Sequence, residues 1–221
     1  MTDHITARQF HEADGTEDWR VVGDGACAYF RTGSFEAGAR LVHAISDLAG
    51  VEQCHPDIDL RHDAVTVRLI TITEDYYGLV ERHVELARQI SAAARELGIP
   101  ADISGVQSVQ VTIDALVNRD VIPFWRAVLG YESRGDTTDE DLIDPRGRGP
   151  ALWFQPMDAP RPQRSRMHID VFVPHEQAEA RVAAALAAGG RLVSDEHAPT
   201  WWTLADPEGN EVDVATLAGR D

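Results

Sequence analysis

The stretch WWTLADPEGNEVDV, residues 201–214, decides the fold of the C-terminal half of the chain. It predicts a strand of large apolar residues, a turn at Asp206-Pro207-Glu208-Gly209-Asn210, and a second strand that carries Asp213. The same order recurs upstream, where Leu142-Ile143-Asp144-Pro145-Arg146-Gly147 precedes Ala151-Leu152-Trp153-Phe154-Gln155. The two hairpins therefore indicate an internal duplication.

Each copy of this duplication predicts the element order β-α-β-β-β. The first copy has a strand over 108–113, a helix over 120–129 ended by Gly130, and three more strands up to Phe154. The second copy has its strand over 168–173 and its helix over 176–188, and strands follow near 191–193, 201–204 and 211–215. We expect two such modules to curve their sheets around a shared cleft.

The first half of the chain has a different pattern. A capping box at Thr6-Ala7-Arg8-Gln9 opens a short helix, Ser34 caps a second helix, and an apolar stripe predicts a third helix over 79–97. Strands over 19–22 and 26–31 flank a Gly-Asp-Gly turn. This half therefore predicts an α+β domain.

The segment after the third helix predicts a domain boundary. Gly98-Ile99-Pro100 stops the helix, so we expect a first domain at 1–98, a linker at 99–105 and a second domain at 106–221. A chain of 221 residues with 43% hydrophobic residues can bury a core in each of two small domains.

Charge and hydropathy exclude several classes of partner. The chain has 20 basic and 37 acidic residues, and 20 − 37 = −17, so a nucleic acid backbone would be repelled. Every basic residue is arginine, which excludes a Walker-type phosphate loop and a Schiff-base lysine. No long apolar run predicts a membrane segment, and the N-terminus does not read as a signal peptide. We expect a cytoplasmic protein in which Cys27 and Cys54 are free thiols.

Four motifs in the second half resemble those of a known superfamily. They are FWRAVLGY at 124–131, ALWFQ at 151–155, MHIDV at 167–171 and LADPEGNE at 204–211. In this order they closely resemble the glyoxalase-like domains of the vicinal-oxygen-chelate superfamily, which includes glyoxalases, bleomycin resistance proteins and dioxygenases. The resemblance implies paired β-α-β-β-β modules.

The same resemblance implies a set of metal ligands. The superfamily uses one ligand on the first strand and one on the fourth strand of each copy to hold a divalent metal. Mapped onto this chain, these positions are His168 and Asp213 in the second copy, and Gln155 with Gln107 or Gln110 in the first. Nitrogen and oxygen donors suit Zn, Mn, Ni or Fe. Because the amides carry no charge, we expect the metal to be weakly held or absent.

Other readings of these residues stay open. His168 is equally well explained as a strand histidine that hydrogen-bonds Asp170, and Asp213 as an ordinary acid beside a turn. Trp153 and Trp201 are candidates to line a cleft for a planar substrate, although tryptophans in strands are mostly core residues.

Five short motifs in the first half also resemble a known family. They are Trp19-Arg20-Val21, Ser34-Phe35, His55-Pro56-Asp57, Gly78-Leu79 and Glu81-Arg82. From Ile5 to Leu97 the chain resembles a pterin-4a-carbinolamine dehydratase domain. The resemblance implies the order α-β-β-α-β-β-α, a homo-oligomer, and a pterin as substrate rather than cofactor.

The dehydratases use three histidines as general acids and bases, and this chain retains only part of that set. His55 remains from a His-His-Pro motif, with Cys54 in place of the first histidine, and Glu74 is the candidate replacement for the third. His62 and His83 are candidate substrate contacts. The alternatives are that His55 fixes a turn and that Cys54 is a small buried apolar residue.

Three functional hypotheses follow. The first two involve a small-molecule substrate or ligand, and none involves a nucleic acid or a membrane. The first is a lyase-type enzyme that joins a dehydratase-like domain with an incomplete histidine set to a glyoxalase-like domain. The second is a non-catalytic, resistance-type binding protein or a metal-dependent glyoxalase or dioxygenase with another substrate. The third is an interaction protein that uses both folds as scaffolds.

Overall fold

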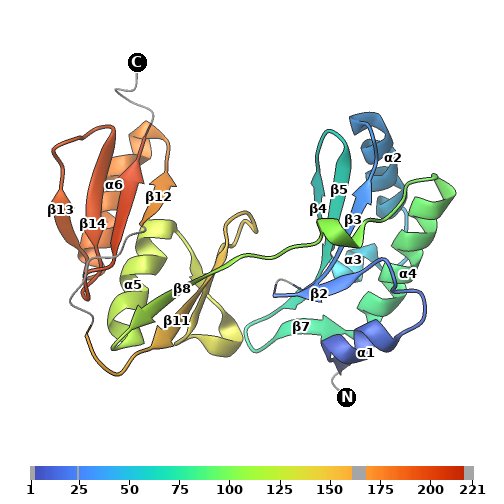
Figure 1. Cartoon of the computed structure of the whole chain (residues 1–221), viewed down its shortest axis with the longest axis horizontal. Coiled ribbons are helices and arrows are strands. Elements are labelled where there is room, and N and C mark those ends of the chain that lie inside the picture. Colours follow the sequence, from blue (N-terminus) through green and yellow to red (C-terminus); the bar gives the residue numbers. More distant parts are fainter. Residues whose placement is uncertain (1–2, 24, 161–167, 217–221) are drawn as a thin grey trace. The chain divides into compact units, whose positions relative to one another are not determined.

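The computed structural model describes residues 3–23, 25–160 and 168–216, and the chain divides into two compact units, Met1–Val109 and Gln110–Asp221 (Figure 1). Asp24, the predicted centre of a hairpin turn, lies outside the described residues. Within the described ranges, no helix is both long and apolar enough to cross a membrane.

The N-terminal unit has the predicted α+β order. Apart from four short elements, β1, α3, β6 and β7, its helices and strands follow as α-β-β-α-β-β-α, which confirms the expected fold class. The elements are β1 (His4–Ile5), α1 (Ala7–Glu12), β2 (Arg20–Val22), β3 (Gly25–Arg31), α2 (Phe35–Ser46), α3 (Val51–Cys54), β4 (Asp57–Leu60), β5 (Ala64–Leu69), β6 (Thr71–Ile72), β7 (Tyr77–Val80), α4 (Glu81–Glu96) and a 3-10 turn, η1 (Ile103–Gly105).

An antiparallel sheet in the order β2-β3-β5-β4 forms the frame of this unit. Val65, Val67 and Leu69 of β5 are buried while Thr66 and Arg68 are not, as strand alternation predicts. Helices α2 and α4 pack together against the sheet (Figure 1). They enclose an apolar core that includes Phe10, Trp19, Phe30, Leu41 and Ile90.

Local capping residues set the helix starts as predicted. The backbone N–H of Gln9 donates to the Thr6 hydroxyl at 3.2 Å, and Ala37 N–H donates to the Ser34 hydroxyl at the same distance. The start of α4 differs from the prediction, because Val80 pairs with His4 in an antiparallel ladder. The helix therefore begins at Glu81, two residues after the predicted start.

The predicted linker over 99–105 packs on the N-terminal unit. Ile99 is buried in its core, Arg31 N–H donates to Pro100 O at 2.9 Å, and Asp102 N–H donates to Tyr29 O at 2.8 Å. These backbone bonds pair the segment with the edge of β3. Residues far away in the sequence therefore hold the segment in place. The chain leaves the unit only after Val109.

The C-terminal unit consists of two modules with the same topology. Their sheets have the orders β8-β11-β10-β9 and β12-β15-β14-β13, and in each sheet the first and last strands of the module are parallel neighbours. The elements are β8 (Gln110–Ala115), α5 (Asn118–Leu129), β9 (Glu132–Ser133), η2 (Gly135–Thr137), β10 (Asp141–Ile143), β11 (Ala151–Pro156), β12 (Ile169–Phe172), α6 (His175–Ala187), β13 (Arg191–Ser194), β14 (Trp201–Ala205) and β15 (Glu211–Ala215). The predicted duplication is confirmed.

Both modules contribute to one apolar core. Helices α5 and α6 pack against each other and against strands of both sheets. The buried side chains come from all parts of the unit and include Ile113, Phe124, Trp125, Leu152, Phe154, Val182, Leu204 and Val212. Neither module encloses this core alone.

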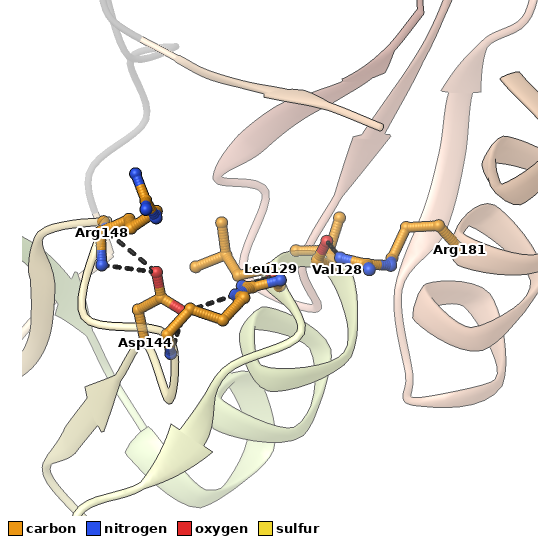
Figure 2. Close-up of polar contacts among 7 residues, drawn as sticks. Val128, Leu129, Asp144, Arg148 and Arg181 are labelled. Carbon is orange, nitrogen blue, oxygen red and sulfur yellow. Dashed lines mark hydrogen bonds and ion pairs between the residues drawn. The ribbon is translucent and has the colours of Figure 1, made fainter. Parts of the chain in front are cut away.

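The two Asp-Pro-x-Gly turns are stabilised by their aspartates. Asp144 accepts backbone N–H bonds from Arg146, Arg148 and Gly149 at 2.9–3.0 Å, and Figure 2 shows Asp144 beside Arg148. Burial opposes the ionisation of Asp144, but these donors outweigh it and lower its pKa to about 2. Asp206 accepts from the Glu208 and Asn210 backbone in the second turn, at 2.9 Å each.

Side chains of the second module hold both ends of helix α5. Glu208 accepts from the backbone N–H groups of Leu116 and Val117, at 2.7 and 2.8 Å, just before the helix. At the other end, Arg181 of α6 donates to Val128 O at 2.9 Å (Figure 2). An acid at the start of a helix and a cation at its end both complement the helix dipole.

Candidate functional site

The candidate site lies on the face of the second sheet that points away from the shared core. Ile169 and Val171 of β12 pack on the core, as do Val212 and Val214 of β15. Because neighbouring residues on a strand point to opposite faces, Asp170 and Asp213 project from the other face. The two acids are direct partners in the parallel register of β12 and β15.

His168 completes a cluster of three possible ligand atoms. Its Nε2 lies 3.2 Å from Asp170 Oδ1 and 3.7 Å from Asp213 Oδ2. All three atoms lie within 4.8 Å of one another. Half of the His168 side chain and 47% of the Asp170 side chain are exposed, against 16% for Asp213, so a ligand reaches the cluster from solvent.

The electrostatics of the cluster favour a bound cation. Like charges on directly opposite strand residues repel each other, and Asp170 and Asp213 are such a pair. An imidazolium at His168 or a metal ion would compensate their charge. One imidazole nitrogen and two carboxylate oxygens are a donor set that fits Zn, Mn, Fe or Ni, so the residues present fit the implied group.

The first module lacks an equivalent set. Leu142 pairs with Leu152 two residues before Asp144, as Leu204 pairs with Val212 two residues before Asp206, so Trp153 is the counterpart of Asp213. Thr112, the register partner of Trp153, then corresponds to Asp170, and Gln110 corresponds to His168. Gln155 lies two residues further along β11, and metal binding by these glutamines stays a prediction. Gln110 is the first residue of β8, and Gln107 precedes the strand and belongs to the N-terminal unit.

The predicted tryptophans both lie on the faces that point away from the core. Trp153 alternates with the buried Leu152 and Phe154 of β11, and it is half-buried. Trp201 of β14 is also half-buried, and the His197 ring stacks on it with a centroid distance of 4.1 Å and an interplanar angle of 25°. Contact with a substrate remains a prediction for both residues.

Asp170, the third member of the cluster, is not among the ligands predicted from the sequence, where its expected role is to hydrogen-bond His168. The spacing His168-Ile169-Asp170 is nevertheless a usable signal, because residues two apart on a strand share a face. A histidine and an acid at that spacing, beside a fourth-strand acid, predict three converging donors.

Three predicted site residues of the N-terminal unit are exposed in separate loops. His55 follows α3 with a φ of 46°, in the left-handed region, and its backbone N–H donates to Val51 O at 2.8 Å. Glu74 lies in the turn between β6 and β7, and His62 lies in the turn between β4 and β5. All three side chains are accessible to a ligand.

Cys54 and His83 have buried, structural surroundings instead. The Cys54 thiol donates to Arg82 O at 3.8 Å, and burial raises its pKa above the usual range, which keeps the thiol neutral. His83 is fully buried, and its Nδ1 accepts from Val80 N–H at 3.3 Å at the start of α4. A neutral ring then carries its proton on Nε2, which lies 3.4 Å from the Thr71 hydroxyl. Neither side chain is placed to meet a substrate directly.

Comparisons with known proteins agree with this division. The family described as pterin 4 alpha carbinolamine dehydratase matches residues 2–93, and the family described as glyoxalase-like domain matches residues 110–215. A Nocardia farcinica protein named "Putative pterin-4-alpha-carbinolamine dehydratase" is 38% identical over 78 residues, which are 35% of this chain and 80% of that protein. A protein of the same name from Chloroflexus aurantiacus is 36% identical over 73 residues, 33% of this chain and 76% of that protein.

Solved structures resemble the chain over about half its length. A glyoxalase/bleomycin resistance protein/dioxygenase from Alicyclobacillus acidocaldarius is 15% identical, with a TM-score of 0.37, and the match covers 50% of this chain and 90% of that one.

Proposed function

The chain belongs to the pterin-4a-carbinolamine dehydratase family through its N-terminal unit and carries a glyoxalase-like domain as its C-terminal unit, and from this premise we propose a two-domain, lyase-type protein whose principal site lies in the C-terminal unit. In this proposal His168, Asp170 and Asp213 hold a divalent cation. The convergence of their donor atoms within 4.8 Å is the observation that carries it.

The bound ion would act as a Lewis acid that polarises an oxygen of a small-molecule substrate. The protein residues supply the binding and the orientation. Asp213 is the most buried of the three side chains, so it is held by the sheet, whereas His168 and Asp170 lie at the solvent side. Two carboxylates supply more negative charge than the single acid and two amides expected from the sequence. We therefore expect tighter metal binding than that set would give.

Metal titration of the chelator-treated full chain tests the proposal. Isothermal titration with Mn²⁺ or Zn²⁺ should show one site per chain, and Asp213→Asn should weaken binding at least about tenfold because a charged donor becomes neutral. Asp195→Asn removes an exposed acid of the same module and serves as the matched control. Absence of binding, or equal affinity in all three proteins, would refute the metal-dependent function.

In the N-terminal unit we propose that His55, assisted by Glu74, binds a pterin-like ring and supports slow dehydration at best. The support is one exposed histidine at a family position next to a buried, neutral Cys54. A carbinolamine dehydration assay on the full chain tests this, with His55→Ala compared against His62→Ala. A fast rate that His55→Ala leaves unchanged would contradict the assigned role.

Self-association is also part of the proposal, because the dehydratase resemblance implies an oligomer. Light scattering at micromolar chain concentration should give a mass above that of one chain. A monomer at all concentrations would contradict it.

A further inference from the structure

Arg181 of α6 is a half-buried arginine that no acid neutralises. The chain has 37 acidic residues for 20 basic ones, and Arg61, Arg68 and Arg134, for example, each lie 2.6–2.7 Å from an aspartate oxygen. In the part of the chain that the structure describes, no carboxylate pairs with Arg181, and the charge that acts on it is that of Arg146. Buried charges in proteins are usually paired, so an anion is the missing partner.

The backbone at the end of α5 holds the Arg181 guanidinium in place. Nη1 donates to Val128 O at 2.9 Å (Figure 2). Gly130 follows with a φ of 67°, and a Cβ there would lie 3.1–3.4 Å from Nη1, Nη2 and Cζ of Arg181. The guanidinium therefore rests against the glycine backbone. It has five N–H donors in all, so most of them remain for another acceptor.

Arg146 brings a second guanidinium to the same helix end. Its Nη2 donates to Leu129 O, the carbonyl after that of Val128, at a long 3.5 Å, and its Nε donates to Asp144 Oδ1 at 2.8 Å. One carboxylate thus faces two guanidiniums, which leaves an excess of one positive charge. Burial first, and then the charge of Arg146, lowers the pKa of Arg181. An anion between the two side chains would relieve this repulsion.

We propose that Arg146 and Arg181 form a binding site for a phosphate group at the C-terminal end of α5. A guanidinium binds an oxyanion through pairs of N–H bonds, and two of them match the two charges of a phosphate better than the single charge of a carboxylate.

This site is separate from the proposed cation site. Helices α5 and α6 pack on the core side of the second sheet, whereas Asp170 and Asp213 project from its other face. The inference therefore goes beyond the proposed function and needs no metal.

An NMR titration of the ¹⁵N-labelled, chelator-treated full chain with inorganic phosphate at pH 8 tests the proposal. The backbone amides of Leu129 and Gly130 should shift and saturate, and acetate should bind at least about tenfold more weakly. Methyl phosphate distinguishes the two sources of the group: equal affinity assigns an esterified ligand, and a loss of about tenfold assigns the free anion. Without a saturable shift at these amides, or with equal affinity for acetate, the proposal is wrong.

Two variants that each lose one positive charge assign the binding to the arginine pair. Arg181→Gln should weaken phosphate binding at least about tenfold, although its amide still offers a donor to Val128 O. Arg148→Gln is the matched control, because Arg148 is exposed in the same turn and binds Asp144 through its backbone N–H. Its affinity should change less than about threefold.

The variants also define the results that overturn the proposal. An equal loss in Arg148→Gln would show that net charge, not the arginine pair, attracts the ion. Circular dichroism checks folding, and Arg181→Lys, which keeps the charge but not the planar group, replaces Arg181→Gln if that variant does not fold. Unchanged phosphate affinity in the folded Arg181 variant overturns the proposal.

Discussion

Replacing His83 with glutamine should make the N-terminal unit less sensitive to acid. His83 is fully buried, and burial first, then the charge of Arg82, lowers its pKa from 6.5 to about 4. Its ring accepts from Val80 N–H and contacts the Thr71 hydroxyl. Glutamine offers an acceptor and a donor of similar reach, but it does not titrate.

The magnitude follows from the difference between the folded and unfolded pKa. Between pH 6.5 and about 4 the unfolded chain binds a proton at His83 and the folded unit does not, so stability present above pH 6.5 is lost as the pH falls. A shift of 6.5 − 4, about 2.5 units, corresponds to about 3 kcal/mol in the limit of low pH. Between pH 7 and pH 4.5 the expected loss is about 2 kcal/mol.

Hydrogen–deuterium exchange in urea measures this loss in the full chain, because peptides from α4 report on the N-terminal unit alone. The gap in unfolding free energy between wild type and His83→Gln should change by about 2 kcal/mol from pH 7 to pH 4.5. His62→Gln, at an exposed histidine of the same unit, should show no such change. A gap that is independent of pH would refute the argument that His83 is held neutral in the core.

Three further predictions concern the C-terminal unit and the boundary. The substitution Asp206→Asn should lower the free energy of unfolding in urea by about 3 kcal/mol. The buried carboxylate accepts a hydrogen bond from the Trp125 indole at 3.0 Å, and an amide nitrogen cannot accept it. A loss below about 1 kcal/mol would contradict this. The substitution Glu208→Ala should lower the free energy of unfolding by about 1 to 2 kcal/mol and speed amide hydrogen exchange at the start of α5. Unchanged exchange would show that the Glu208 carboxylate does not stabilise this end of the helix. Proteinase K should cut first within 106–109 and leave two folded fragments, and a first cut within 99–105 would contradict the observed packing.

The sequence predicted best those features that depend on neighbouring residues. The caps at Thr6 and Ser34 and the two Asp-Pro-x-Gly turns were predictable because each forms from hydrogen bonds within a few residues. The start of α4 was predicted less well, because it depends on the pairing of Val80 with His4 across the unit. The packing of 99–105 on β3 is likewise set by distant partners.

The candidate site shows the same limit. His168 and Asp213 were predicted as ligands from motif positions, and the structure brings them together. Gln107 or Gln110 was predicted for the first strand of the first copy, and the sequence left this choice open because the start of β8 depends on its pairing with β11, some 40 residues later. Helix periodicity is consistent with the burial of His83, because this residue precedes the buried Ala87 and Ile90 by four and seven residues. Its hydrogen bonds were not predictable, because they depend on Val80 and Thr71, which lie before the helix.

The cap that Glu208 provides also constrains how the chain folds during synthesis. Glu208 lies 92 residues after Leu116, and Asp206 lies 81 residues after Trp125, so the first module meets these partners only when the second hairpin has been translated. Until then the N–H groups before α5 have only water as a partner, and the Trp125 indole lacks its acceptor. We expect a ribosome-bound chain that ends near residue 160 to hold a folded N-terminal unit followed by a loosely ordered first module. The duplicated half would then fold as one late event rather than module by module.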